Sequence, residues 1–233
     1  QLVTLSFTWG PLACTAPVPP AWSISAEMVA YLAFPLVIAS GLLRGRRGAA
    51  ALLVTGIAGY LAMQVLWGGF HVYDGRAPVR ALSGFCIGLA LWRLTRSSGG
   101  LAGSSAATAQ GVALAALVTG IALDLAPIAL LAASVGLIFA VASGEGPVAR
   151  FLSARPLMVL GRLSFGLYLW HWFAIMALAQ MGNAATLPVA IIAVGLVLVG
   201  AELSYRLIEM PARRAINAKL AHPAARPSRA VEG

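Results

Sequence analysis

The stretch WSISAEMVAYLAFPLVIASGLL (22–43) decides the fold of this chain. It holds one charged residue, Glu27, among aliphatic and aromatic side chains. Its length matches the roughly 20 apolar residues that a helix needs to cross a bilayer. An ionised carboxylate there costs about 2.5–3.5 kcal/mol on insertion scales. The stretch therefore predicts a transmembrane helix whose Glu27 faces the bundle, where a hydroxyl or an arginine shares its charge.

The whole chain has the composition of an integral membrane protein. Of its 233 residues, 60% are apolar and only 10% are charged, and the mean hydropathy is +0.88. Soluble domains carry roughly 25% charged residues. The net charge of +9 comes from short basic clusters between apolar runs, which is typical of membrane-protein loops and not of a phosphate-binding groove. We therefore expect a lipid bilayer as partner and no nucleic acid.

Seven apolar runs, separated by glycine, proline and charged residues, predict an all-α, polytopic transmembrane bundle of about seven helices. The expected spans are 22–42, 48–67, 78–94, 108–123, 126–142, 156–181 and 187–209. Residues 1–21 are expected to form an extracytoplasmic loop and residues 22–211 the bundle, because Pro211 ends the last helix. Residues 212–233 are expected to form a basic, disordered cytoplasmic tail.

Arginine-rich and arginine-poor loops alternate along the chain, and this alternation predicts an orientation. Cytoplasmic loops are enriched in Lys and Arg, so the rich side should face the cytoplasm. We expect a multi-pass protein of the bacterial inner membrane that starts outside, with Glu27 near the outer surface and the C-terminus in the cytoplasm. The rich side carries Arg44, Arg46, Arg47, Arg93, Arg96, Arg150, Arg155 and the basic tail.

Cysteine and histidine positions predict neither a disulfide framework nor a metal site. Cys14 and Cys86 lie far apart in the sequence. His71, His171 and His222 lack the spacing of metal ligands. No metal is therefore expected.

Ser23, Glu27 and Tyr31 recur every four residues in the first span. This spacing puts a hydroxyl, a carboxylate and a phenol on one helix face, as a polar substrate or a partner arginine would require. The alternative is structural: Ser23 caps the helix and Glu27 favours the positive end of its dipole.

In GRLSFGLYLWHW (161–172), Ser164, Tyr168 and His171 share another helix face. A histidine in a transmembrane helix is a functional candidate, and imidazole can move protons near neutral pH. A binding or orienting role is favoured over that of a direct base. The alternative is an interhelical hydrogen bond from a histidine flanked by tryptophans.

Acidic and basic residues follow a helical spacing in the last span, where Glu202, Arg206 and Glu209 share a face. A Glu four residues before an Arg is the favourable order for a helix ion pair, so a structural pair is the favoured interpretation. Arg162 and Arg206 could also contact phosphates from the cytoplasmic side. Arg80, outside, could be a surface charge or a contact for an anionic partner.

Four motifs in this order resemble the acyltransferase 3 family, membrane O-acetyltransferases that modify surface polysaccharides. WSISAE (22–27), followed by Tyr31, resembles the family's Trp-Ser-x-Ser-x-Glu motif. RALSGFCIGLALW (80–92) resembles an Arg-x-x-x-x-Phe-x-x-Gly helix of the family. LGRLSFGLYLWHW (160–172) and SYRLIEMPARR (204–214) resemble its late serine, tyrosine and histidine run and its closing segment.

The resemblance implies transfer of an acyl group, acetyl from acyl-CoA, to a hydroxyl of a carbohydrate or lipid-linked glycan, with no permanently bound cofactor. It also assigns roles by position in the motifs. Glu27 and His171 are expected to be catalytic, Ser23, Tyr31, Ser164, Tyr168 and Arg80 to bind substrate, and Arg162 and Arg206 to contact the acyl-CoA.

The family also carries an arginine followed by a histidine in its first transmembrane helix, and no helix with that pair precedes WSISAE here. We therefore expect this chain, which starts at Gln1, to be the C-terminal part of a longer enzyme with an odd number of helices upstream, and to be inactive alone. Two other classes remain: a transporter or channel with a relay of Glu27 and His171, and a catalytically inactive scaffold.

Overall fold

The computed structural model describes residues 6, 8–9, 20–70, 74–182 and 186–220. Within these ranges the chain is built from helices and contains no strand. It divides into two compact units, Gln1–Met158 and Val159–Gly233. Cys14, His71 and His222 lie outside the described residues.

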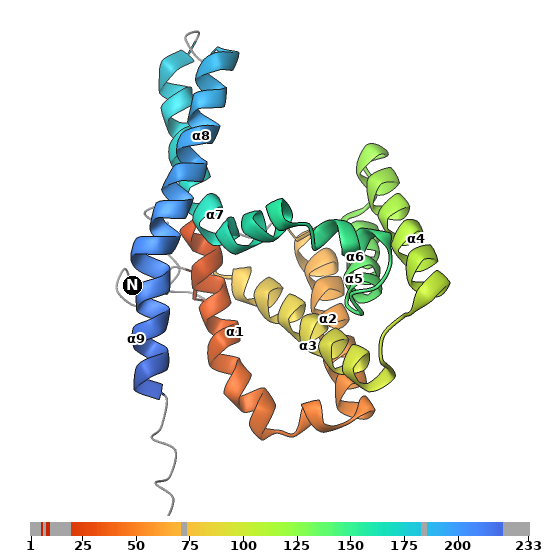
Figure 1. Cartoon of the computed structure of the whole chain (residues 1–233). Helices are drawn as coiled ribbons and strands as arrows, with labels where there is room; N and C mark the ends of the chain where they lie inside the picture. The colour runs from red at the N-terminus through yellow and green to blue at the C-terminus, as the bar shows by residue number, and fades with distance from the viewer. Residues whose placement is uncertain (1–5, 7, 10–19, 71–73, 183–185, 221–233) are drawn as a thin grey trace, which may run out of the picture. The chain divides into compact units, whose positions relative to one another are not determined.

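The helices of the first unit lie where the apolar runs predicted them (Figure 1). Glycines in the left-handed region, such as Gly68 and Gly99, follow the last residues of α2 and α3. Prolines stand at the first turns of α3, α5 and α6, where a missing N–H costs nothing. The elements are α1 (Ala21–Ala39), α2 (Arg46–Trp67), α3 (Ala77–Ser98), α4 (Gly103–Ala122), α5 (Pro127–Val141) and α6 (Pro147–Leu152), with a 3₁₀ turn at Leu42–Arg44.

Five helices in the described part of the chain are long and apolar enough to cross a membrane: α1, α2, α4, α7 (Arg155–Met181) and the continuous helix Leu187–Lys219. The other two predicted spans fall short of this. α3 carries arginines near both ends, and α5 has 15 residues, about 22 Å at 1.5 Å per residue. The short helix α6 was not predicted and lies in the loop after α5.

α2 and α3 approach each other closely because glycine lines their contact. A Cβ at Gly56 would lie 2.6 Å from the backbone carbonyl oxygen of Ser83, so a larger residue would push the two helices apart. Partly buried side chains of α5 pack against the same core. The buried members of this core come from α2 and α3 and are Tyr60, Met63, Ile87 and Leu91.

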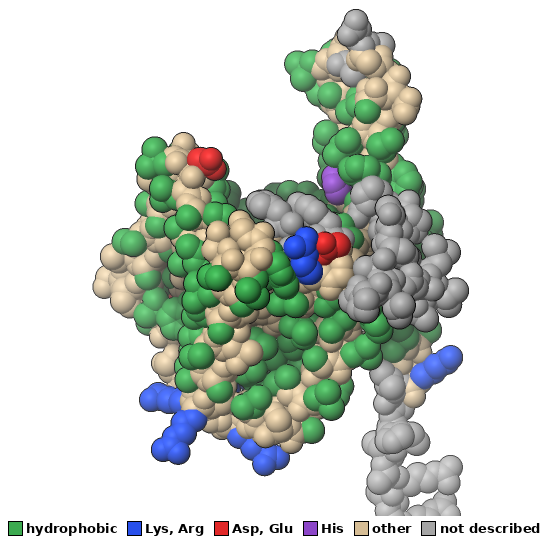
Figure 2. Space-filling view, turned by 180° about the vertical axis from the view of Figure 1, so that it is seen from behind, with side chains coloured by type: hydrophobic (Ala, Val, Ile, Leu, Met, Phe, Trp, Pro, Cys, Tyr) green, Lys and Arg blue, Asp and Glu red, His purple; other side chains and the backbone are tan. Residues whose placement is uncertain are grey.

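Loops that the arginine pattern assigns to one side lie together in the first unit. At one end, Nη2 of Arg93 donates to the carbonyl oxygen of Arg44 at 3.1 Å. The N–H of Gly103 donates to the carboxylate of Glu145 at 2.8 Å. At the other end, the turn 124–127 shares a pocket with the first turn of α3. Basic side chains gather at the lower end of the first unit in Figure 2. The grouping agrees with the predicted alternation, whereas the side that faces the cytoplasm stays a prediction.

In the second unit, α7 and α8 (Leu187–Ser204) lie side by side (Figure 1). A Cβ at Gly166 would lie 3.0 Å from the Cα of Ala201, so glycine again permits close packing. The indole Nε1 of Trp170 donates to the hydroxyl of Ser204 at 2.9 Å, which adds a polar contact between the two helices.

The prediction that Pro211 ends the last helix is wrong. A π-helical turn, Tyr205–Glu209, follows α8 and leads into α9 (Met210–Leu220). The N–H of Met210 donates to the carbonyl of Tyr205, five residues back. This wider turn accommodates a proline ring that would clash in a regular α-helix. Residues 212–220 of the predicted disordered tail are therefore helical, and residues 221–233 lie outside the described residues.

Candidate functional site

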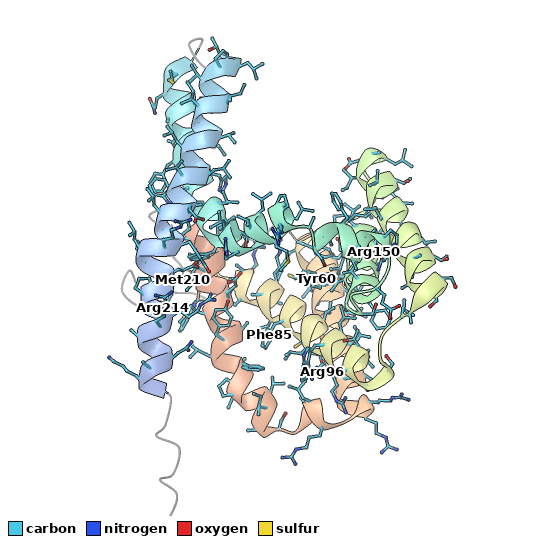
Figure 3. The ribbon with its side chains drawn as sticks, in the orientation of Figure 1. Tyr60, Phe85, Arg96, Arg150, Met210 and Arg214 are labelled. Carbon is cyan, nitrogen blue, oxygen red and sulfur yellow. The ribbon has the colours of Figure 1, made fainter. Side chains whose placement is uncertain are left out.

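An open pocket of about 430 Å³ lies between α1, α2 and α3, near the first turns of α1 and α3. Figure 3 shows two of its lining residues, Tyr60 of α2 and Phe85 of α3, with Arg96 at the far end of α3. The pocket therefore lies away from the arginine-rich end. Four residues predicted for the site from the sequence line it together: Ser23, Glu27, Tyr31 and Arg80.

Glu27 is exposed at the edge of this pocket. Its Oε2 accepts a hydrogen bond from the hydroxyl of Tyr31 at 3.2 Å. The spacing of four residues places the two side chains one above the other, as predicted. The carboxylate lies within two turns of the start of α1 and lines the same pocket as Arg80.

Ser23 does not cap α1, so that alternative interpretation is wrong. The helix begins at Ala21 with Pro20 as its N-cap residue and has no side-chain cap. Instead, the hydroxyl of Ser23 donates to the carbonyl oxygen of Pro20 at 3.0 Å. Since its proton is engaged there, the hydroxyl oxygen offers lone pairs to a donor in the pocket.

Arg80 brings a positive charge into the pocket. Its guanidinium Cζ lies 5.7 Å from the ring centroid of Trp22, and Nη1 donates to the carbonyl oxygen of Phe70 at 3.4 Å. Arg80 and Tyr60 line the pocket together. Within the described ranges the salt bridges are formed by Arg76 and Arg206, so no described carboxylate neutralises Arg80. Its charge remains for an anion or a developing negative charge.

Ser25, which the sequence analysis treated only as part of a motif, anchors an earlier segment beside the pocket. It is fully buried. Its hydroxyl oxygen accepts from both the N–H and the hydroxyl of Thr8 at 3.0 Å. Its carbonyl oxygen accepts from the indole Nε1 of Trp9 at 3.0 Å. Ser25 follows Ser23 by two residues, so it faces the opposite side of α1. This spacing in the sequence already indicated a different role for Ser25.

Tyr60 is a second residue that sequence reasoning missed. It is buried in the core of the first unit, and its ring packs edge-on against Phe70 at 4.9 Å between centroids. A Cβ at Gly84 would lie 3.2 Å from its hydroxyl, so the glycine leaves room for this oxygen at the pocket wall. Its only signal in the sequence was a lone phenol within an apolar run.

Asp74 and Arg76 form an ion pair in the loop before α3. Nη2 of Arg76 lies 2.7 Å from Oδ2 of Asp74. The guanidinium hydrogen bonds hold the pKa of the Asp74 carboxyl below its usual value. The Cζ of Arg76 also lies 5.3 Å from the ring centroid of Trp67. Arg76 is therefore a paired surface charge, in contrast to Arg80.

His171 belongs to the second unit. Its Nδ1 contacts the carbonyl oxygen of Tyr168 on the same helix. Nδ1 is therefore the ring nitrogen engaged within the helix, and Nε2 is the one left for another partner. The tyrosine ring lies 5.5 Å from the imidazole, and Ser164 is exposed on the same helix. The interhelical hydrogen bond beside His171 comes from Trp170.

The two arginines predicted to contact the acyl donor also lie in the second unit. Arg206 forms an ion pair with Glu202, as the spacing predicted. The Cζ of Arg162 lies 5.2 Å from the ring centroid of Tyr205, the residue before Arg206. The structure thus places both arginines at the same end of the α7–α8 pair. All the predicted residues from Arg162 onward belong to the second unit, whereas Ser23, Glu27, Tyr31 and Arg80 belong to the first.

The acidic, histidine and cysteine side chains are the candidate metal ligands in the described parts of the chain. No group of three or more His, Cys, Asp or Glu side chains is placed there to hold an ion. The chemistry that the pocket offers is that of a carboxylate, a phenol, a hydroxyl and a guanidinium. Such a set can bind a hydroxyl compound, accept its proton and stabilise negative charge.

Comparison with known proteins gives a family. A sequence profile for an acyltransferase domain, that of the acyltransferase 3 family, matches residues 1–206. O-acetyltransferase OatA from Staphylococcus aureus strains NCTC 8325, COL and MRSA252 is 38% identical over 68 residues, 28% of this chain and 11% of the relative. The match therefore spans only a small part of these curated relatives, and no solved structure matches the chain. Because the profile covers most of the chain, the chain belongs to the acyltransferase 3 family.

Proposed function

We propose that the protein is an integral membrane O-acyltransferase that moves an acyl group, acetyl in the simplest case, from acyl-CoA to a hydroxyl of a carbohydrate or lipid-linked glycan. The observation that carries this proposal is the pocket in which Glu27 and Tyr31 of α1 meet Arg80 of α3. Family membership supports the acyltransferase class. The name of the Staphylococcus aureus relatives, O-acetyltransferase, supports acetyl as the group and oxygen as the acceptor atom.

The pocket residues divide the chemistry between them. The carboxylate of Glu27 accepts the proton of the acceptor hydroxyl as its oxygen attacks the thioester carbonyl. A new C–O bond forms, the C–S bond breaks, and the thiolate of CoA takes up the proton that Glu27 received. Arg80 stabilises the negative charge on the carbonyl oxygen. Tyr31 orients the carboxylate through its hydrogen bond, and Ser23 accepts a hydrogen bond from the acceptor.

Residues of the second unit supply the remaining proposed contacts. Arg162 and Arg206 provide positive charge for the phosphates of the acyl donor. Nε2 of His171 accepts a hydrogen bond from a substrate hydroxyl and orients it. Ser164 and Tyr168, on the same helix, add hydroxyl groups to this binding face.

The proposed setting is the bacterial inner membrane, with the C-terminus in the cytoplasm. Membrane-spanning helices support a multi-pass protein. The pocket lies at the arginine-poor end of the first unit, so it opens toward the outside if the arginine-rich end faces the cytoplasm. An acceptor at the cell surface can then reach Glu27, while the acyl donor, held by its phosphates on the cytoplasmic side, must extend its thioester to the same pocket.

The test uses the complete gene product reconstituted in liposomes, with radiolabelled acetyl-CoA and surface polysaccharide of the source bacterium. Alkali-labile acetyl ester on the polysaccharide is measured. We expect transfer by the wild type and a fall of about 100-fold or more in Glu27→Gln, the range of general-base catalysis. Glu145→Gln, at the other end of the first unit, serves as the matched control and keeps its activity.

Two outcomes would contradict the proposal. Undiminished transfer by Glu27→Gln, with the same elution profile as the wild type, would remove the carboxylate from the mechanism. Hydrolysis of acetyl-CoA without ester on any carbohydrate would exclude the proposed acceptor class.

A further inference from the structure

A second pocket adjoins the first across two shared side chains. It has a volume of about 610 Å³ and lies between the first turn of α3, the start of α5 and the turn that joins α4 to α5. Tyr60 and Arg80 line both pockets. The two spaces therefore adjoin at the same phenol and guanidinium.

The lining of the second pocket combines aromatic and hydrogen-bonding groups. Phe70 and Tyr60 present two rings in edge-on contact. Asp124 adds an exposed carboxylate that takes part in no ion pair among the described residues. The hydroxyl of Ser134 donates to the carbonyl of Leu130 at 2.8 Å, so its oxygen can accept from a ligand.

Asp124 is held in place by an unusual backbone conformation. Its φ is +50°, the only positive value at a non-glycine residue within the described ranges. Hydrogen bonds close the turn around it: the N–H of Asp124 donates to Ile121 at 3.2 Å, and that of Leu125 donates to Gly120 at 2.8 Å. Asp and Asn tolerate this left-handed region better than most residues. The turn therefore fixes the backbone of Asp124 at the pocket wall.

We propose that the second pocket binds a further sugar unit of the acceptor, one that is not itself acylated. This inference rests on the proposed function. Rings offer apolar surface to the faces of a sugar, while the carboxylate and the hydroxyl accept hydrogen bonds from its OH groups. A lipid tail fits this lining poorly because Asp124 and Arg80 would be costly against hydrocarbon. The enzyme therefore prefers acceptors of two or more sugar units over a single sugar.

The first experiment measures the dependence of transfer on acceptor length. The complete gene product is assayed with one-, two- and four-unit fragments made by partial hydrolysis of the surface polysaccharide. For the wild type we expect KM to fall between the one-unit and two-unit fragments. Asp124→Asn keeps the left-handed turn and removes the charge. It should raise KM for the longer fragments about ten-fold, the effect of a hydrogen bond to a charged group, with kcat and the one-unit KM unchanged.

A carboxylate outside the second pocket provides the control for this experiment. Asp74 has an exposed carboxylate in the loop between α2 and α3 and does not line the pocket. Asp74→Asn should therefore leave every KM as in the wild type. Equal wild-type KM values at all lengths, or an Asp124→Asn defect of the same size at all lengths, would overturn the inference while leaving the proposed function standing. Absence of wild-type transfer to every fragment would overturn the proposed function and the inference with it.

A second experiment measures occupancy without turnover. Ala126 lines the second pocket and is exposed, so Ala126→Cys, on a background with Cys14 and Cys86 replaced by alanine, reports on access. The two-unit fragment should slow labelling by a maleimide, and the one-unit fragment should not. Equal protection by both fragments, or protection by phosphatidylglycerol vesicles without sugar, would overturn the assignment of the pocket to a second sugar.

Discussion

The hydroxyl of Tyr31 donates a hydrogen bond to the carboxylate of Glu27 across one turn of α1, at 3.2 Å. Both side chains line the pocket that Arg80 enters from α3. This hydrogen bond engages one oxygen of the carboxylate, and in the proposed function the other oxygen accepts from the substrate hydroxyl. In the proposed mechanism this hydrogen bond positions the base.

Removing that hydroxyl should slow the reaction and leave the fold intact. We expect Tyr31→Phe to lower kcat about ten-fold, because a hydrogen bond to a charged group contributes about 1.5–3 kcal/mol and water replaces part of it. KM should change less, since the ring remains. Tyr205→Phe is the matched control, because the ring under Arg162 persists. An unchanged kcat in Tyr31→Phe would show that Glu27 needs no positioning.

Replacement of Arg80 by lysine tests the planar guanidinium. The guanidinium contacts the ring of Trp22 and the carbonyl of Phe70 together, and a lysine ammonium cannot reproduce both contacts. We expect kcat/KM to fall about ten-fold or more, the value of one lost charged hydrogen bond. Arg93→Lys, at the other end of α3, should retain wild-type activity. Equal losses in both variants would point to a general effect on α3 and not to the pocket.

Helix positions and the Glu27 stripe could be predicted from the sequence because both depend on local spacing. Apolar runs mark the helices, and the 3.6-residue period places Tyr31 above Glu27. Arg80 was predicted for the site through a motif, whereas its contact with Trp22 joins residues 58 positions apart and follows from packing alone. Tyr60 was missed for the same reason, since its hydroxyl reaches the pocket only because Gly84 leaves room.

The two wrong predictions, the helix end at Pro211 and the cap at Ser23, each applied a local sequence rule at a position where the neighbouring backbone differs from a regular helix. A proline would normally end a regular α-helix, and this rule was applied to Pro211. The π-helical turn before Pro211 changes the position of its ring against the preceding carbonyl groups, so the helix continues. The period of a π-helix leaves no mark in a short sequence pattern. Ser23 likewise fitted the rule for caps, yet the helix begins at Ala21 and its hydroxyl bonds to Pro20.

Loss of the Ser25 hydroxyl should destabilise the first unit. Thr8 donates two hydrogen bonds to this oxygen, and both residues are buried. Ser25→Ala leaves those donors without a partner, which costs about 1–3 kcal/mol and should lower the midpoint of thermal unfolding in detergent. Ser40→Ala, whose exposed hydroxyl bonds within its own turn, should change the midpoint little. Equal midpoints for both variants would exclude Ser25 as an anchor.

The last prediction concerns the orientation of the chain in the membrane. The arginine pattern predicts this orientation, and the contacts between loops assigned to the same side agree with it. Single cysteines in the complete gene product, with Cys14 and Cys86 replaced, are labelled in intact cells by a membrane-impermeant maleimide. Cysteines at Gly75 and Ala126 should react, and those at Gly45, Ser98 and Ser153 should react only after the cells are permeabilised.

The pair Ser98→Cys and Ala126→Cys decides this prediction, because α4, which is long and apolar enough to cross a membrane, lies between the two positions. A helix of 20 residues covers about 30 Å, so one end must be accessible while the other is shielded. Labelling of both in intact cells would show that α4 does not cross. Labelling of Ser98→Cys alone would invert the protein and place the pocket of Glu27 on the cytoplasmic side. The acceptor would then have to be a cytoplasmic glycan precursor, so this experiment also constrains where the acyl group is transferred.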